Sequence, residues 1–270
     1  MQGPLREPQG EIARRPSSIA PVWHTAALIA FILAISIAGA YRDPGSANPV
    51  RIHRLQTYGV TAALEAALVG WVAFGLRLRK IPVRSLFGAV PGKLRSIALD
   101  AGIAIVFWIG SMSALGTVAL FWMGVEAAVT HRLPQMHAGK VIPPNPSEQH
   151  AIHAVLRLAP SNGTEIACWI LLCLVVGVAE ELVFRGYLQK QFTAWSRDTA
   201  AVGVALSSIT FGAAHGWEGV RSMFMLTIFG VFFSLLALFR KSLRAGILAH
   251  GWHDVFMGLM VSFLHARHVL

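Results

Sequence analysis

Apolar stretches long enough to cross a lipid bilayer recur along most of this 270-residue chain. A membrane-spanning helix needs roughly 20 apolar residues. Only 13% of the residues are charged, whereas a soluble domain carries about 25%. The sequence therefore predicts an all-α, polytopic transmembrane helical bundle of seven spans, with eight as the alternative. The expected spans are residues 22–40, 57–76, 97–124, 164–189, 199–216, 220–239 and 243–264.

The chain divides into three parts along its length. Residues 1–21 are polar and rich in Pro and Gly, which predicts a flexible tail. We expect residues 22–160 to form N-terminal transmembrane helices with their loops, and residues 161–270 to form the transmembrane core that holds most of the buried polar groups. No small-residue cleavage motif follows the first span, so we expect a retained anchor rather than a signal peptide.

Positive charge is distributed as membrane insertion requires. The tail and the connections after the second, fourth and sixth spans hold most of the 23 Lys and Arg residues. Because cytoplasmic loops are enriched in these residues, we predict a cytoplasmic N-terminus in a plasma (inner) membrane. The net charge of +10 is spread over short loops rather than gathered on one stripe. This pattern favours the lipid bilayer as a partner and argues against nucleic acid.

Ionisable residues inside the predicted spans each need a reason, because one costs roughly 2.5–3.5 kcal/mol at a helix centre. His24, Asp100 and Glu165 lie near span ends, where headgroups and water can satisfy them, so we interpret them as structural. Glu65 lies deeper, in TAALEAALVGW, and we interpret it as an interhelical hydrogen-bonding anchor. The other ionisable residues fall into three local groups on late spans.

The first group lies in VVGVAEELVFRGYL, residues 175–188. Glu181 and Arg185 are four residues apart with the acid first, the favoured order for a pair on one helix. Glu180 is left over on a different face, and Gly177, one turn earlier, is expected to leave space beside it. An unpaired carboxylate in an apolar span is costly, so Glu180 is predicted to be a working group and Glu181 and Arg185 its support.

The other two groups repeat this spacing. SSITFGAAHGW places Phe211 and His215 four residues apart among small residues that permit close helix packing. AGILAHGWHDVFMG places His250 and Asp254 four residues apart, with His253 partly on the same side. For Glu180 to meet both histidines, the span at 199–216 must be short, tilted or displaced, and HGWEG is a candidate irregular segment.

In their order, these groups resemble the motifs EExxxR, FxxxH and HxxxN/D of the CaaX-protease and bacteriocin-processing (CPBP, Abi-like) family of intramembrane proteases. The resemblance covers roughly residues 163–265. It implies a membrane-embedded endopeptidase with Glu180, His215, His250 and Asp254 in catalytic roles, and Glu181, Arg185 and Phe211 as support. It also implies a membrane-embedded or lipid-anchored peptide or protein substrate, such as a prenylated CaaX protein.

The chemistry of these residues fits that implication. Glu180 is suited to act as a general base on water, and His215 to hold that water from the other side. His250 and residue 254 can supply hydrogen bonds to the oxyanion that forms on the substrate. The family position often held by Asn is Asp254 here, which donates a hydrogen bond only when protonated.

Other interpretations stay open at this stage. Two histidines with carboxylates are also a plausible zinc set, so any metal would come from Glu180, His215, His250 and Asp254. No other cofactor is predicted. A proton-coupled transporter would also bury such groups, although no related halves are evident. A non-catalytic membrane binding or immunity protein would keep the same residues as a structural cluster.

Overall fold

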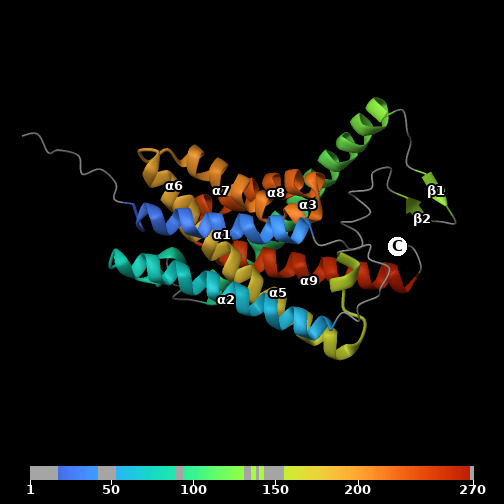
Figure 1. Cartoon of the computed structure of the whole chain (residues 1–270), viewed down its shortest axis with the longest axis horizontal. Helices are drawn as coiled ribbons and strands as arrows, with labels where there is room; N and C mark the ends of the chain where they lie inside the picture. Colours follow the sequence, from blue (N-terminus) through green and yellow to red (C-terminus); the bar gives the residue numbers. More distant parts are fainter. Residues whose placement is uncertain are drawn as a thin grey trace, which may run out of the picture.

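The fold is a bundle of long helices (Figure 1). The computed structural model describes residues 18–41, 53–88, 94–130, 135–137, 140–142 and 155–267. The expected tail at residues 1–21 lies mostly outside these ranges. The helices described are α1 (Val22–Ala40), α2 (Arg54–Leu78), α3 (Leu94–Thr130), α5 (Gly163–Glu180), α6 (Gln189–Trp195), α7 (Ala200–Ala214), α8 (Val220–Arg240) and α9 (Arg244–Ala266). The prediction of a polytopic helical bundle is confirmed.

Shorter elements connect the helices. One 3₁₀ turn, η1 (Val83–Leu86), follows α2, and another, η3 (Gly216–Glu218), joins α7 to α8. Beyond the end of α3, β1 (Gln135–His137) pairs antiparallel with β2 (Lys140–Ile142). The last turns of α3 project beyond the other helices (Figure 1).

The spans agree closely with those expected from the sequence. Within the described ranges, six helical segments are long and apolar enough to cross a membrane, and they coincide with six of the expected stretches. The remaining stretch, residues 199–216, contains the shorter helix α7, with 15 residues. At 1.5 Å per residue α7 rises about 22 Å, less than the ~30 Å of a hydrocarbon core. One of the conditions for the three motifs to meet, a short element at this position, is therefore fulfilled.

The outer surface of the bundle is apolar in the way a lipid-facing surface must be. On α3, Ile105, Val106, Leu120 and Phe121 each expose more than half of their surface. A protein in water rarely exposes contiguous apolar area on this scale, whereas lipid tails cover it at no cost. The chain is an integral multi-pass membrane protein.

The centre of the bundle is the continuation of α5. From Glu181 to Leu188 the helix widens into a π-helical segment, η2 (Glu181–Leu188), and all of its residues are buried. This segment packs against α7, and the aromatic ring of Phe184 meets that of Phe211 edge-on at 5.0 Å. π-Helical segments are rare and occur often at functional sites, because the extra residue re-aims the side chains around it.

The ionisable residues near the span ends have structural roles, as expected. His24 is fully buried, with its Nε2 2.8 Å from the carbonyl oxygen of Trp71 and its Nδ1 2.9 Å from the hydroxyl of Tyr187. Asp100 binds the guanidinium groups of Arg240 at 2.7 Å and Arg244 at 2.6 Å. Their partners are protein groups rather than the headgroups and water that the sequence suggested.

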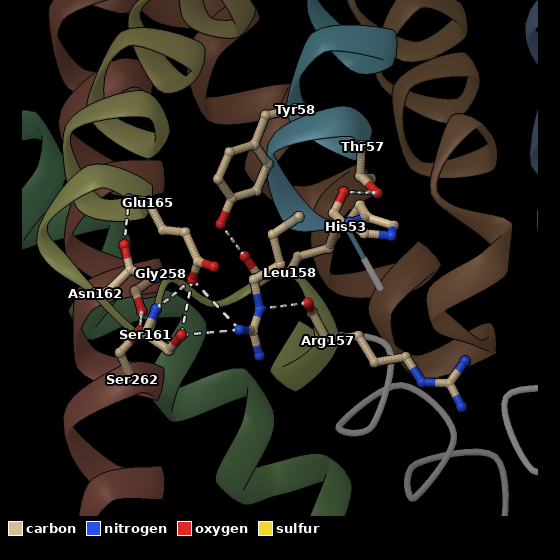
Figure 2. Close-up of polar contacts among 11 residues, drawn as sticks. His53, Thr57, Tyr58, Arg157, Leu158, Ser161, Asn162, Glu165, Gly258 and Ser262 are labelled. Carbon is tan, nitrogen blue, oxygen red and sulfur yellow. Dashed lines mark hydrogen bonds and ion pairs between the residues drawn. The ribbon is translucent and has the colours of Figure 1, made fainter. Parts of the chain in front are cut away.

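Glu165 links α2 to α5 in the same way (Figure 2). Its Oε2 lies 3.3 Å from Nη1 of Arg54 and accepts the backbone N–H of Ser161 at 2.8 Å. The side chain of Asn162 caps α5 by accepting the backbone N–H of Glu165 at 3.0 Å. This network fixes one end of the α2–α5 contact.

Candidate active site

The three sequence motifs come together where α5, η2, α7 and α9 converge. Glu180 is the last residue of α5, and Glu181 and Arg185 lie on η2. Phe211 lies on α7, and His215 follows its last residue. His250 and Asp254 lie on α9. Ring contacts connect the elements, since Phe211 lies 5.0 Å from His215 and 6.0 Å from His250 between ring centroids.

A close crossing of α5 and α9 places His250 beside the two glutamates. A Cβ atom at Gly177 would lie 2.9 Å from the backbone nitrogen of Gly251 and 3.3 Å from the carbonyl oxygen of Ile247. Real Cβ atoms do not come so near to a backbone, so the crossing requires glycine at this position. The expectation that Gly177 leaves space beside Glu180 is wrong, because the backbone of α9 fills that space.

Glu181, Arg185 and His250 form a continuous buried chain of contacts. Oε1 of Glu181 accepts a hydrogen bond from Nη1 of Arg185 at 2.9 Å and another from Nδ1 of His250 at 3.0 Å. The side chains of Glu181 and Arg185 have no exposed surface. The predicted ion pair is present, and it also holds the imidazole of His250 in place.

Aromatic rings and a glycine enclose this ion pair. The guanidinium carbon of Arg185 lies 4.3 Å from the ring centre of Phe211 and 5.1 Å from that of Phe233. Such cation–π contacts stabilise a charge that water does not reach. A Cβ atom at Gly246 would lie 2.9 Å from Oε2 of Glu181, so glycine there makes room for the carboxylate.

Glu180 differs from its neighbour in its partners, because it pairs with His250 alone whereas Glu181 pairs with both Arg185 and His250. Its Oε2 atom is buried and accepts no hydrogen bond from the described residues. The nearest cationic group is Nε2 of His250, at 3.4 Å, and the same nitrogen lies 3.8 Å from Oδ2 of Asp254. Glu180 and Asp254 therefore face the same edge of one imidazole ring.

The hydrogen bonds fix which ring nitrogens carry protons. Nδ1 of His250 faces a carboxylate oxygen, which can only accept from it while Glu181 is ionised, so Nδ1 carries a proton. Nδ1 of His215 lies 2.9 Å from the carbonyl oxygen of Phe211, an obligatory acceptor, so it too is protonated. In its neutral form His215 then has Nε2 as a hydrogen-bond acceptor. The half-buried His215 also interacts electrostatically with Asp254.

Two further carboxylates belong to these surroundings, and the sequence did not assign either to the site. Glu218, in the connection between α7 and α8, interacts with His215 and Glu180. Burial raises the pKa of Glu218, the negative charge of Glu180 raises it further, and His215 opposes the shift. Glu65 on α2 interacts electrostatically with Glu180, His250 and Asp254. Its position in the middle of an apolar span was the one available signal.

His253 has a packing role. Its Nδ1 accepts a hydrogen bond from Nε1 of Trp108 at 3.3 Å, and its ring meets Phe229 at 4.9 Å. Both contacts join α9 to neighbouring helices. His253 thus lies beside the site without facing Glu180.

The possible metal ligands named from the sequence each have other partners. Among the residues that the structure describes, no group of three His, Cys, Asp or Glu side chains could hold a metal ion. Both nitrogens of His250 face carboxylates, and Nδ1 of His215 is taken by the backbone of its own helix. The zinc set considered from the sequence stays a prediction, and no role is assigned to a metal here.

The centre of the bundle thus gathers two adjacent glutamates, two histidines and an aspartate, which are side chains capable of general acid–base chemistry. Residues 162–256 match the family model described as Rce1-like, type II CAAX prenyl endopeptidase. The match confirms the CPBP resemblance and supports an intramembrane protease activity. It contains every residue of the three motifs. The comparison with curated proteins gave no match, and neither did the comparison with solved structures.

Proposed function

We propose that this protein is an intramembrane endopeptidase that hydrolyses a peptide bond of a membrane-associated or prenylated, CaaX-type peptide or protein. The observation that carries the proposal is the difference between two adjacent glutamates. Glu181 binds both Arg185 and His250 through its Oε1 atom, whereas Glu180 forms an ion pair with His250 alone, at 3.4 Å, and Oε2 of each glutamate accepts no hydrogen bond from the described residues. A carboxylate in that state can accept a proton during catalysis.

In the first step Glu180 takes a proton from water while the water oxygen attacks the substrate carbonyl carbon. The acceptor Nε2 of neutral His215 holds the second hydrogen of the same water. Glu181 binds Nδ1 of His250 and so holds the ring in one orientation. In this orientation Nε2 of His250 lies on the side of Glu180. Preorganised groups of this kind act without reorganising when charge develops.

In the tetrahedral intermediate the former carbonyl oxygen carries negative charge. Nε2 of His250, when protonated, and a protonated Asp254 are the donors nearest to Glu180. Removing one such donor typically costs about 10²–10³ in rate. The proposed mechanism uses a neutral Asp254 in the role that an Asn plays in relatives, and it routes no step through a metal.

The experiment for this function uses a purified protein in detergent micelles with a farnesylated CaaX peptide as the probe. Mass spectrometry should detect release of the tripeptide after the prenylated cysteine. A protein that cleaves neither this peptide nor a panel of transmembrane peptides would be a binding or immunity protein instead. Proton uptake coupled to solute movement in liposomes, without cleavage, would favour a transporter.

We further propose that the N-terminus is cytoplasmic and the membrane is the plasma (inner) membrane, on the basis of the charge distribution. In this orientation η1 faces the cytoplasm. A thiol reagent that does not cross the membrane should label Arg84→Cys only from the cytoplasmic side. Labelling from the external side would reverse the orientation.

A further inference from the structure

Glu65 lies near the middle of α2, a helix outside the matched segment 162–256. The sequence around it, TAALEAALVGW, offers no charged partner on its own helix within a turn. A charged residue at such a depth is costly, so it is retained for a reason. The structure places groups of other helices near Glu65, and these groups indicate its role.

The surroundings of Glu65 are the proposed active site. Helix α2 packs against α5, and the carboxyl group of Glu65 interacts electrostatically with Glu180, His250 and Asp254. Its Oε2 atom is buried and has no hydrogen-bond partner among the described residues. An interhelical anchor would show a partner for this atom. The earlier interpretation of Glu65 as such an anchor therefore lacks the contact that it needs at this oxygen.

The charges around His250 do not balance if every acid is ionised. Five carboxyl groups lie in or beside the site, namely those of Glu65, Glu180, Glu181, Glu218 and Asp254, whereas the groups that can carry positive charge are Arg185, His250 and His215. In a low-dielectric interior an uncompensated carboxylate takes up a proton instead. Glu181 contacts both cations, and Glu180 lies 3.4 Å and Asp254 3.8 Å from His250. No ion pair is recorded for Glu65 in the described part of the chain, so ionising Glu65 is the least compensated choice.

We propose that Glu65 is a further catalytic residue, supplied by α2, that holds a proton and delivers it to the leaving amine. This inference rests on the proposed function. Once water has added to the carbonyl carbon and Glu180 holds its proton, the C–N bond breaks. The nitrogen keeps the electron pair and takes the proton of Glu65, which releases a free amine and a carboxylic acid. The proton on Glu180 then returns to the Glu65 carboxylate, and both groups are reset.

The first test compares Glu65→Gln with two variants that carry the same chemical change. Glu165→Gln is the matched control, because Glu165 also connects α2 with α5 but lies at the helix end. Glu180→Gln reports on the proposed function. For the farnesylated CaaX peptide, we expect Glu65→Gln to lower kcat by about 10²-fold or more with KM little changed. It should also remove the fall in kcat at high pH that ionisation of the acid causes. Glu165→Gln should keep the wild-type profile.

The outcomes separate the two proposals. Wild-type kcat and an unchanged pH profile in Glu65→Gln, with Glu180→Gln inactive, would overturn the role of Glu65 alone. An active Glu180→Gln variant would overturn the proposed function itself. Loss of activity in both Glu65→Gln and Glu165→Gln would mean that the α2–α5 contact, rather than the proton, is what matters.

A second test needs no substrate. The infrared C=O stretching band of protonated carboxylic acids should lose intensity in Glu65→Gln at neutral pH, compared with wild type and with Glu165→Gln. An unchanged band would show that Glu65 is ionised, and the inference would then be wrong even if activity fell.

Discussion

Nδ1 of the His250 ring lies 3.0 Å from Oε1 of Glu181, an atom that also receives a hydrogen bond from Arg185. One carboxylate oxygen thus joins helix α9 to η2. The contact distinguishes the two adjacent acids, because Glu181 is fixed in a buried network with Arg185 and His250 while Glu180 pairs with His250 alone. The consequences of this division can be measured.

Removing the charge of Glu181 should destabilise the fold. In Glu181→Gln the guanidinium of Arg185 stays buried without its anionic partner, and breaking a buried pair in this way costs about 3–5 kcal/mol. Thermal unfolding in detergent should therefore begin at a clearly lower temperature. The control is Glu165→Gln, whose pair with Arg54 is partly exposed and should contribute at most about 1 kcal/mol. Equal losses in the two variants would contradict this role of Glu181.

A methyl group at the α5–α9 crossing should reduce both stability and activity. In Gly177→Ala the new Cβ meets the backbone of Gly251, which cannot move aside without separating the helices. His250 would then shift away from Glu180. The matched variant is Gly59→Ala on α2, where a Cβ meets no atom within 4 Å. It should be as stable as wild type or more so, since Ala favours a helix by about 1 kcal/mol over Gly. A fully active Gly177→Ala enzyme would show that this crossing does not position the site.

Stability should fall as the pH rises above the ordinary pKa of Glu218. Burial raises the pKa of Glu218 in the folded protein above its ordinary value of 4.5. Between the two values the folded state binds more protons than the unfolded state, so its stability decreases with increasing pH. The contribution is fully present below pH 4.5 and is lost as the pH passes the raised value. Glu218→Gln should unfold at a temperature that depends less on pH over this window. Identical pH dependences would mean that Glu218 is not buried as described.

Asp254→Asn should keep much of the activity if Asp254 acts as a neutral hydrogen-bond donor. The amide supplies the same donor and loses nothing at high pH, so any fall in rate caused by ionising Asp254 should disappear. Chelators should leave the wild type active, because the proposed mechanism routes no step through a metal. Two results together would instead make Asp254 a metal ligand. Purified active protein would contain stoichiometric zinc, and the Asp254→Asn variant would be inactive under every condition tested.

Much of the fold could be predicted from the sequence, because hydropathy over some 20 residues identifies a span almost irrespective of its neighbours. The pair Glu181–Arg185 was predictable for a similar reason, since i, i+4 spacing is local. The contact of Gly177 with α9 was not predictable, because a glycine in one helix does not reveal which other helix will pack against it. The same holds for Glu65, whose neighbours come from helices more than 100 residues away in sequence.

The π-helical widening at η2 was also not predictable, since an apolar helix and a π-helical segment share one composition. The shortness of α7 was anticipated only as a geometric requirement of bringing His215 to Glu180. That the three motifs lie together was thus expected from the sequence, whereas the positions of Glu65 and Glu218 and the arrangement of the side chains depended on tertiary packing.

The central claim is that Glu180, and not Glu181, activates water for peptide hydrolysis. The most direct measurement is the rate of cleavage of the farnesylated CaaX peptide by Glu180→Gln, set beside its unfolding temperature in the same detergent. Our account predicts loss of cleavage by at least about 10²-fold with an unfolding temperature close to that of the wild type, because the fully buried pair of Glu181 with Arg185 stays intact. A Glu180→Gln protein that cleaves at the wild-type rate, or one that loses activity only because it no longer folds, would contradict the account.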